Sequence, residues 1–188
     1  GGYTGPADDI AAGPRYPGRD GTLTAWVDDL NRDILGRYDT RLCGGFAEPF
    51  YRAPVNTLFA EIRYTRDFER SALHELAHWC VAGSERRRQD DYGYWYAPDG
   101  RDHQQQQLFF QVEIKPQAIE KHFCTALGLP FDVSADNLAS PQVSGLDGFR
   151  CAVDAQYCAY SGNGLPGRAA VIADWLQQWR HNRDVKTL

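Results

Sequence analysis

The 188-residue sequence lacks an apolar run of membrane-spanning length, and its start lacks the charged, apolar and small-residue pattern of a secretory signal. These absences argue against a membrane protein and predict a soluble cytoplasmic one. The chain also contains no methionine and begins Gly1-Gly2. We therefore expect that its native start is missing or replaced by a tag remnant.

The sequence has five cysteines but no C-x-x-C pair. An odd number without paired spacing argues against both a disulfide framework and a thiolate zinc site. We therefore expect free, buried thiols.

An excess of basic residues is also missing, since 20 lysines and arginines stand against 25 aspartates and glutamates. A net charge of −5 does not suit a nucleic-acid-binding surface. The one basic run, residues 86–88, is followed after Gln89 by Asp90 and Asp91, so we interpret it as a locally paired, solvated segment. We expect a monomer with no nucleic-acid partner and no membrane partner.

The most informative motif is H-E-x-x-H, formed by His74, Glu75 and His78. Apolar and small residues surround it at roughly helical spacing, with Asp67 or Thr65 as possible caps and Gly83 as a possible stop. Residues four apart lie on one face of a helix, so both imidazoles can reach a single divalent metal. The motif indicates a metal site, and either zinc or ferrous iron suits it.

The length predicts one domain. Residues 1–21 are rich in glycine and proline, which predicts a flexible N-terminal extension or tag remnant before a domain spanning 22–188. Helical spacing follows from Thr22 to Gly36, and a β-branched and aromatic segment at 57–64 predicts a strand. Further helices are expected at 102–114, 116–128, 146–160 and 166–180. Together these elements predict an α+β fold with a small sheet packed against the metal-bearing helix.

A catalytic metal site needs a third protein ligand. The extended motif H-E-x-x-H-x-x-G-x-x-H is excluded, because Val81 and Ser84 occupy the required glycine and histidine positions. Glu113 stands out because it falls among apolar residues of a helical stretch, where a carboxylate needs a cation or several donors. An ion pair with Lys115 or Arg101 is the alternative to a role as metal ligand. The candidates are His103, His122, Asp99, Asp102, Glu85 and Glu113.

A larger set of motifs resembles the bacterial elongation factor P hydroxylase family. The resemblance covers roughly residues 22–185, is strongest from 71 to 138 and is loose from 140 to 165. Its motifs are ALHELAHWC at 72–80, YGYWYAPDGRD at 92–102, VEIKPQA at 112–118, PFDVS at 130–134 and DNL at 136–138.

The resemblance implies a non-haem iron hydroxylase domain whose metal ligands are His74, His78 and Glu113. It implies Fe(II) as cofactor, molecular oxygen as co-substrate and elongation factor P as protein substrate, hydroxylated on a lysine that carries a β-lysyl group. It also implies a fold similar to that of a metal-dependent bacterial ribonuclease, although a shared fold does not carry function with it. The sequence has no flavin or nicotinamide fingerprint, so it does not indicate the electron donor.

A β-lysylated side chain carries ammonium groups, which acidic and aromatic residues can hold. The aromatic run 92–96 suits a pocket wall, although a core strand explains it equally well. The aspartates among the substrate-contact candidates suit a turn and a helix cap equally well. The candidates are Tyr94, Tyr96, Asp99, Arg101 and Asp102.

Two other functions fit the motif. In a zinc metallopeptidase with Glu113 as distal ligand, Glu75 would be the catalytic general base. In a hydroxylase, Glu75 would instead orient a ligand or a bound water. A non-enzymatic module stabilised by a metal is the third possibility, and it would need a closed site with four protein ligands.

Overall fold

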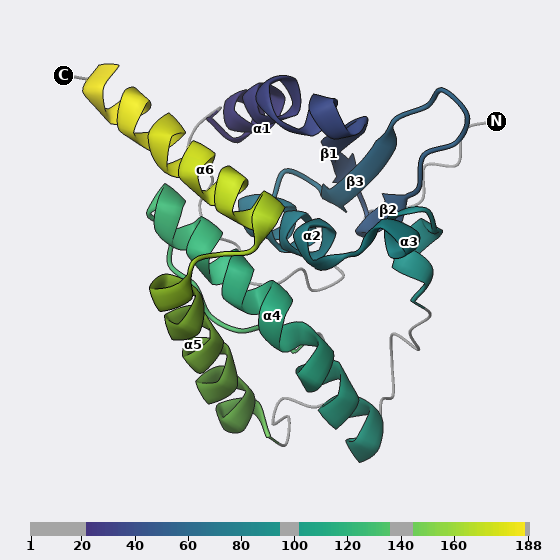
Figure 1. Ribbon diagram of the computed structural model, residues 1–188, viewed down its shortest axis with the longest axis vertical. Coiled ribbons are helices and arrows are strands. Elements are labelled where there is room, and N and C mark those ends of the chain that lie inside the picture. Colours follow the sequence, from purple (N-terminus) through teal and green to yellow (C-terminus); the bar gives the residue numbers. More distant parts are fainter. Residues whose placement is uncertain (1–21, 95–101, 136–144, 187–188) are drawn as a thin grey trace.

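The computed structural model describes residues 22–94, 102–135 and 145–186 (Figure 1). The expected extension, residues 1–21, lies outside this part of the chain. The α+β prediction is confirmed, because one small sheet is combined with several helices. The elements are α1 (Thr22–Asp33), the 3-10 helix η1 (Leu35–Tyr38), β1 (Thr40–Phe46), β2 (Phe50–Arg52), β3 (Ala60–Thr65), α2 (Glu69–Val81), α3 (Ser84–Arg87), the 3-10 helix η2 (Asp90–Gly93), α4 (His103–Leu127), α5 (Leu146–Asn163) and α6 (Gly167–Lys186).

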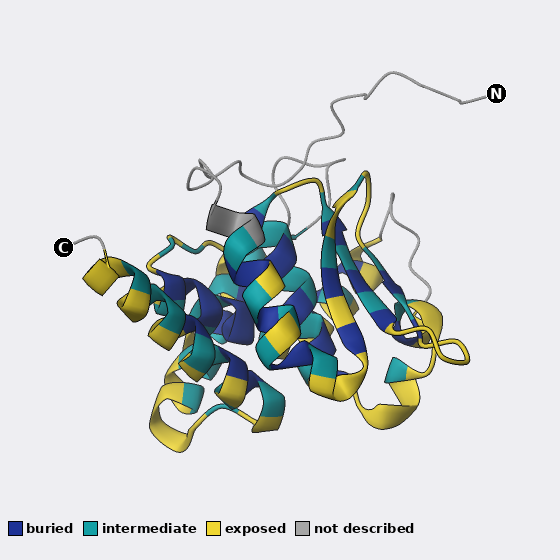
Figure 2. Ribbon diagram, turned by 90° about the horizontal axis from the view of Figure 1, so that it is seen from above, coloured by how far each residue is buried: buried dark blue, intermediate teal, exposed yellow. Residues whose placement is uncertain are grey.

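The sheet has three strands in the order β1-β3-β2, with β1 parallel and β2 antiparallel to the central β3. Successive side chains of a strand point to opposite faces, and β3 accordingly buries Ala60, Ile62 and Tyr64 while the residues between them are partly exposed (Figure 2). These three residues share one hydrophobic core with residues of α1 and α2. The sheet therefore supplies the base on which the H-E-x-x-H helix rests.

Helix α2 lies between the sheet and the helical part of the molecule. It packs on β1 and β3 on one side and on α4 on another, while α5 and α6 pack on α4 (Figure 1). Within α2, Leu73, Leu76 and Ala77 are completely buried. None of the helices in the described ranges combines the length and apolar character that crossing a bilayer requires.

Helix α4 is one continuous element of 25 residues, so the prediction of two helices separated at Pro116 was wrong. Proline removes one backbone hydrogen bond, but Pro116 lies on the buried side of the helix, where tertiary packing outweighs that loss. The helix begins with a capping box between Asp102 and Gln105. The helix ends at Leu127, and Gly128 is its C-cap residue with a φ of 71°, a conformation that favours glycine. The predicted stop at Gly128 is therefore confirmed.

Two boundaries and the burial of the cysteines also differ from the prediction. The third strand begins at Ala60 rather than at residue 57, because a turn containing Asn56, with φ of 54°, occupies the preceding positions. Neither Asp67 nor Thr65 caps α2, since Phe68 is the N-cap residue and makes no side-chain cap. All five cysteines are free as expected, but only Cys124 is buried, while Cys43 and Cys80 are partly exposed and Cys151 and Cys158 are exposed.

Both ends of α2 are held by other elements. At its start the indole of Trp26 in α1 donates a hydrogen bond of 3.1 Å to Glu69. At its end the Arg168 guanidinium of α6 donates to the carbonyls of Trp79, Cys80 and Ala82 at 2.8, 3.1 and 2.7 Å. A cation at this end also complements the helix dipole, so Arg168 fixes the helix that carries the two histidines.

We predict that Arg168→Met lowers the free energy of unfolding by about 2 kcal/mol, because partly buried carbonyls lose a charged donor. Urea unfolding followed by circular dichroism measures the change. Arg32→Ala is the control, because Arg32 is largely exposed and pairs only locally with Asp29 and Asp33, so it should leave the unfolding midpoint unchanged. Equal midpoints for wild type and Arg168→Met would contradict the assigned role.

Candidate metal centre

The two histidines of the motif lie side by side on α2. Their ring centroids are 4.8 Å apart, and their side chains keep 17% and 19% of their surface exposed for His74 and His78. The apolar residues of the same helix are buried in the core, which turns the imidazoles toward α4. The predicted arrangement of two imidazoles on one helix face is therefore confirmed.

Helix α4 presents three polar side chains toward these histidines. Glu113, Gln117 and Glu120 follow each other at spacings of four and three, which places them on one helix face. They are 3%, 0% and 2% exposed. Sequence reasoning selected Glu113 but missed Gln117 and Glu120, although this spacing of polar residues along a buried stripe was a readable signal.

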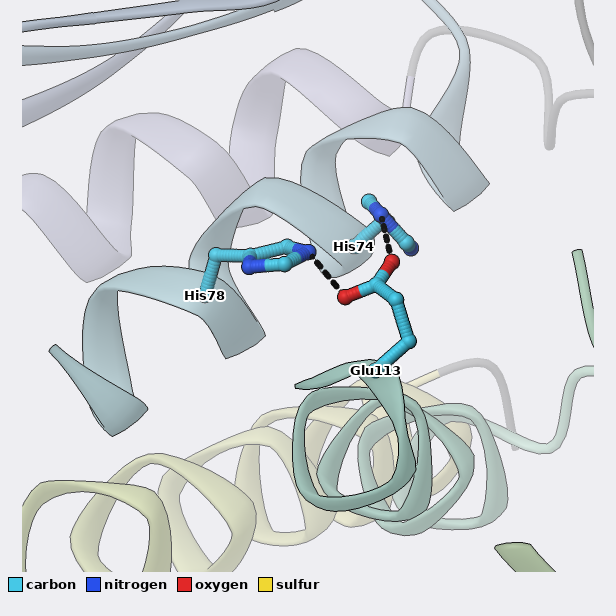
Figure 3. A group of neighbouring side chains, drawn as sticks. All are labelled: His74, His78 and Glu113. Carbon is cyan, nitrogen blue, oxygen red and sulfur yellow. Dashed lines mark ion pairs between the residues drawn. The ribbon is translucent and has the colours of Figure 1, made fainter. Parts of the chain in front are cut away.

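Glu113 points into the gap between the two imidazoles (Figure 3). Its Oε2 lies 2.9 Å from His78 Nε2, and its Oε1 lies 3.5 Å from His74 Nε2. Although Oε2 is buried, it has no hydrogen bond of good geometry within the described residues. The alternative ion pair of Glu113 with Lys115 is not found there either, and Arg101 lies outside those residues. A carboxylate aimed at two imidazoles, without a fixed cation of its own, suits a bound metal ion.

Charge within the cluster is strongly coupled. Burial lowers the pKa of His74, but the neighbouring Glu120 carboxylate outweighs burial and leaves this pKa well above its usual value. Burial raises the pKa of Glu113, yet His78 and then His74 hold it at about 2. Glu113 is therefore ionised near neutral pH, which is the form that binds a cation.

A second set of contacts holds the cluster from behind. Nδ1 of His74 lies 2.6 Å from Glu120 Oε1, and Arg70 donates to the other oxygen of Glu120. The Gln117 amide is 3.5 Å from Glu113 Oε1, and it exchanges two hydrogen bonds of 2.7 and 3.0 Å with the backbone of Ser134. The three inward-pointing side chains are thus held in place before any ion binds.

The ligand atoms of His74, His78 and Glu113 all lie within 4.8 Å of one another, which qualifies them as a group that can hold a metal. Two nitrogens and one carboxylate match both catalytic zinc sites and the two-histidine, one-carboxylate site of ferrous enzymes. Among the described residues only three side chains form the group and both imidazoles keep partial exposure, so the cluster is not fully enclosed, which suits a catalytic site better than a closed site with four protein ligands.

The other predicted site residues occupy different positions. Glu75 is half-buried, and its charge raises the pKa of both histidines and of the buried Tyr92. The face of Tyr94 lies against the Arg86 guanidinium at 4.0 Å, and Asp102 caps α4. Tyr96, Asp99 and Arg101 lie outside the described residues.

The described part of the aromatic run, residues 92–94, is not a strand, because η2 ends at Gly93; Tyr92 stacks on Tyr51 at a centroid distance of 4.2 Å. The remaining ligand candidates are engaged elsewhere. His103 contacts Gln107 at the start of α4, and His122 stacks on Tyr157 of α5. Glu85 is exposed and pairs with Arg88.

Fold and site together define a class: an α+β protein in which an H-E-x-x-H helix and a carboxylate from a second helix form a candidate metal centre. A family model described as "Elongation factor P hydroxylase" matches residues 30–187. A protein of Haemophilus influenzae named "Elongation factor P lysine hydroxylase" is 44% identical over 160 residues, which are 82% of this chain and 87% of that protein. The chain therefore belongs to the elongation factor P hydroxylase family. These matches give no support to the zinc peptidase alternative.

Proposed function

We propose that this protein is an enzyme that hydroxylates a lysine side chain of elongation factor P. The observation that carries this proposal is the cluster of His74, His78 and Glu113, open on one side, in a member of this family. We further propose the lysine bearing a β-lysyl group as the target. Because the substrate is a translation factor, we place the reaction in the cytoplasm.

In this proposal His74 and His78 hold the metal through Nε2, and Glu113 supplies a carboxylate oxygen. A ferrous ion bound in this way supplies the redox chemistry and the open coordination positions that a dioxygen-dependent hydroxylation needs. The residues of the chain fix the imidazole planes and supply one negative charge. They also shield one side of the site through the apolar packing of α2.

Glu75 is proposed to hold or move a proton at the edge of the site. It follows His74 on α2, and its charge acts on both imidazoles although it is not part of the three-ligand group. A half-buried carboxylate in this position can orient a bound water or a ligand without coordinating the ion.

The cationic end of the substrate needs acidic or aromatic partners. Tyr94 and Asp102 stay proposed contacts, together with Tyr96, Asp99 and Arg101 outside the described residues. Tyr94 already receives a cation on one ring face, and Asp102 uses one carboxylate oxygen as a helix cap.

We predict that His74→Ala, His78→Ala and Glu113→Ala each lose most of the bound metal while the domain stays folded, because one ion depends on all three ligands. Metal analysis and circular dichroism of the purified variants measure both quantities. His122→Ala is the control, since that ring stacks on Tyr157 instead. Full metal content in Glu113→Ala would mean that the third ligand is misassigned.

Glu75→Gln should keep the metal and lose activity by about 100-fold or more, because a proton-transfer group contributes at least that factor. Metal content and turnover are measured on the same preparation. Loss of the metal in this variant would instead make Glu75 a ligand, and unchanged turnover would remove it from the reaction.

With ferrous iron and air, the protein should add one oxygen atom to β-lysylated elongation factor P. We expect the unmodified factor to react at least about tenfold less well, because losing one charge-assisted contact of about 1.5 kcal/mol has that effect. Intact-mass spectrometry of both forms measures the products. The Glu113→Ala variant and an oxygen-free reaction are the controls. No mass gain with iron confirmed in the site would refute the hydroxylase function, and cleavage of the factor would favour the peptidase.

A further inference from the structure

The second nitrogen of His74 faces away from the cluster and meets a carboxylate. Nε2 lies toward Glu113, whereas Nδ1 lies 2.6 Å from Glu120 Oε1. An ionised carboxylate only accepts hydrogen bonds, so the Nδ1 atom must carry the proton that joins them. In the neutral form of the ring, which is the form that binds a metal, the lone pair then lies on Nε2, on the side of the cluster.

We propose that Glu120 is a positioning residue of the metal centre, which holds Nδ1–H of His74 and thereby keeps the Nε2 lone pair directed at the ion. This inference rests on the proposed ligand set of His74, His78 and Glu113. Partners of this kind fix the tautomer and orientation of a ligating histidine.

Glu120 is placed to do this because it cannot turn away. It is 2% exposed, and its second oxygen accepts hydrogen bonds from Nε and Nη2 of Arg70. A buried carboxylate is stable only when both oxygens have partners, and here one is the histidine and the other the arginine. Arg70 lies four residues before His74, on the same face of α2.

Arg70 is itself fixed by the segment 130–135. It donates to the carbonyls of Pro130 and Asp132 at 3.2 Å each, and its guanidinium lies 4.9 Å from the ring centre of Phe131. In the same segment, the backbone of Ser134 exchanges two hydrogen bonds with Gln117, which lies three residues before Glu120 on α4. Two helices and this segment thus determine where the Glu120 carboxylate lies.

His78 provides an internal comparison. The Nε2 atom of His78 forms an ion pair with Glu113. Among the described residues, no carboxylate pairs with its Nδ1 atom. A change at Glu120 should therefore affect His74 and leave the ring of His78 as it is.

The first test measures affinity for Co(II), used as a spectroscopic probe ion, by competition with a chelator. We expect Glu120→Ala to weaken Co(II) binding by about 10- to 100-fold, and the isosteric Glu120→Gln to weaken it less, because an amide can still accept from Nδ1–H. Glu61→Gln is the matched control, since Glu61 is an arginine-bound carboxylate on β3 that touches neither histidine. This control should bind Co(II) like the wild type.

The second test follows the ring N–H protons of the two histidines by NMR in the Co(II)-loaded protein. In the wild type, the His74 proton is covered by Glu120 and should exchange slowly with D2O. Glu120→Ala should speed up that exchange and leave the His78 signal unchanged. A purely structural role would change the unfolding free energy but neither the Co(II) affinity nor this exchange rate.

The outcomes separate the two proposals. A wild type that binds no Co(II), or a His78→Ala variant that binds it unchanged, overturns the proposed ligand set. If His78→Ala loses binding while both Glu120 variants match the wild type, the inference about Glu120 alone is overturned. If Glu120→Ala does not fold, the affinity of Glu120→Gln decides, and wild-type affinity in that variant overturns the inference.

Discussion

Buried carboxylates on α4 face nitrogen-bearing side chains on α2, and this pairing constrains the rest of the structure. Glu113 and Glu120 are 3% and 2% exposed, so each needs compensating partners. The partners follow opposite orders along the two helices: Arg70 and His74 meet Glu120, whereas His74 and His78 meet Glu113. Sliding one helix past the other by a turn would break these contacts together and leave charges buried without partners, so the pairing fixes the register of α2 against α4.

That register is useful only if α2 itself is held firmly. Trp26 binds the first residue of α2, and Arg168 binds three carbonyls at its end. Between these ends, apolar side chains bury one side of the helix against the sheet. The histidines therefore project from a rigid element, which suits a site whose ligand positions must be set before an ion arrives.

Sequence alone predicted the parts of the site that depend on local periodicity. The spacing of His74 and His78 sets their common face, and the apolar surroundings of Glu113 pointed to its burial. Contacts between distant residues were not predictable, such as the pair of Arg70 and Glu120, which are 50 positions apart. Glu120 was not predicted because it does not face the metal position. Its partner is Nδ1 of His74, the ring nitrogen on the other side of that proposed ligand. The break expected at Pro116 failed for a related reason, since packing on neighbouring elements outweighs a local helix-breaking preference.

The two histidines differ in how completely they are held, and this difference bears on the chemistry. His74 is engaged at both ring nitrogens, whereas the recorded contact of His78 is to Glu113. The ring of His74 is therefore the more firmly oriented of the two. Both rings keep some of their surface exposed, whereas Glu120 is almost completely buried. With the proposed ligand set, the buried contacts would orient the ligands and the exposed ring edges would leave room for small molecules, which suits an enzyme better than a closed structural metal site.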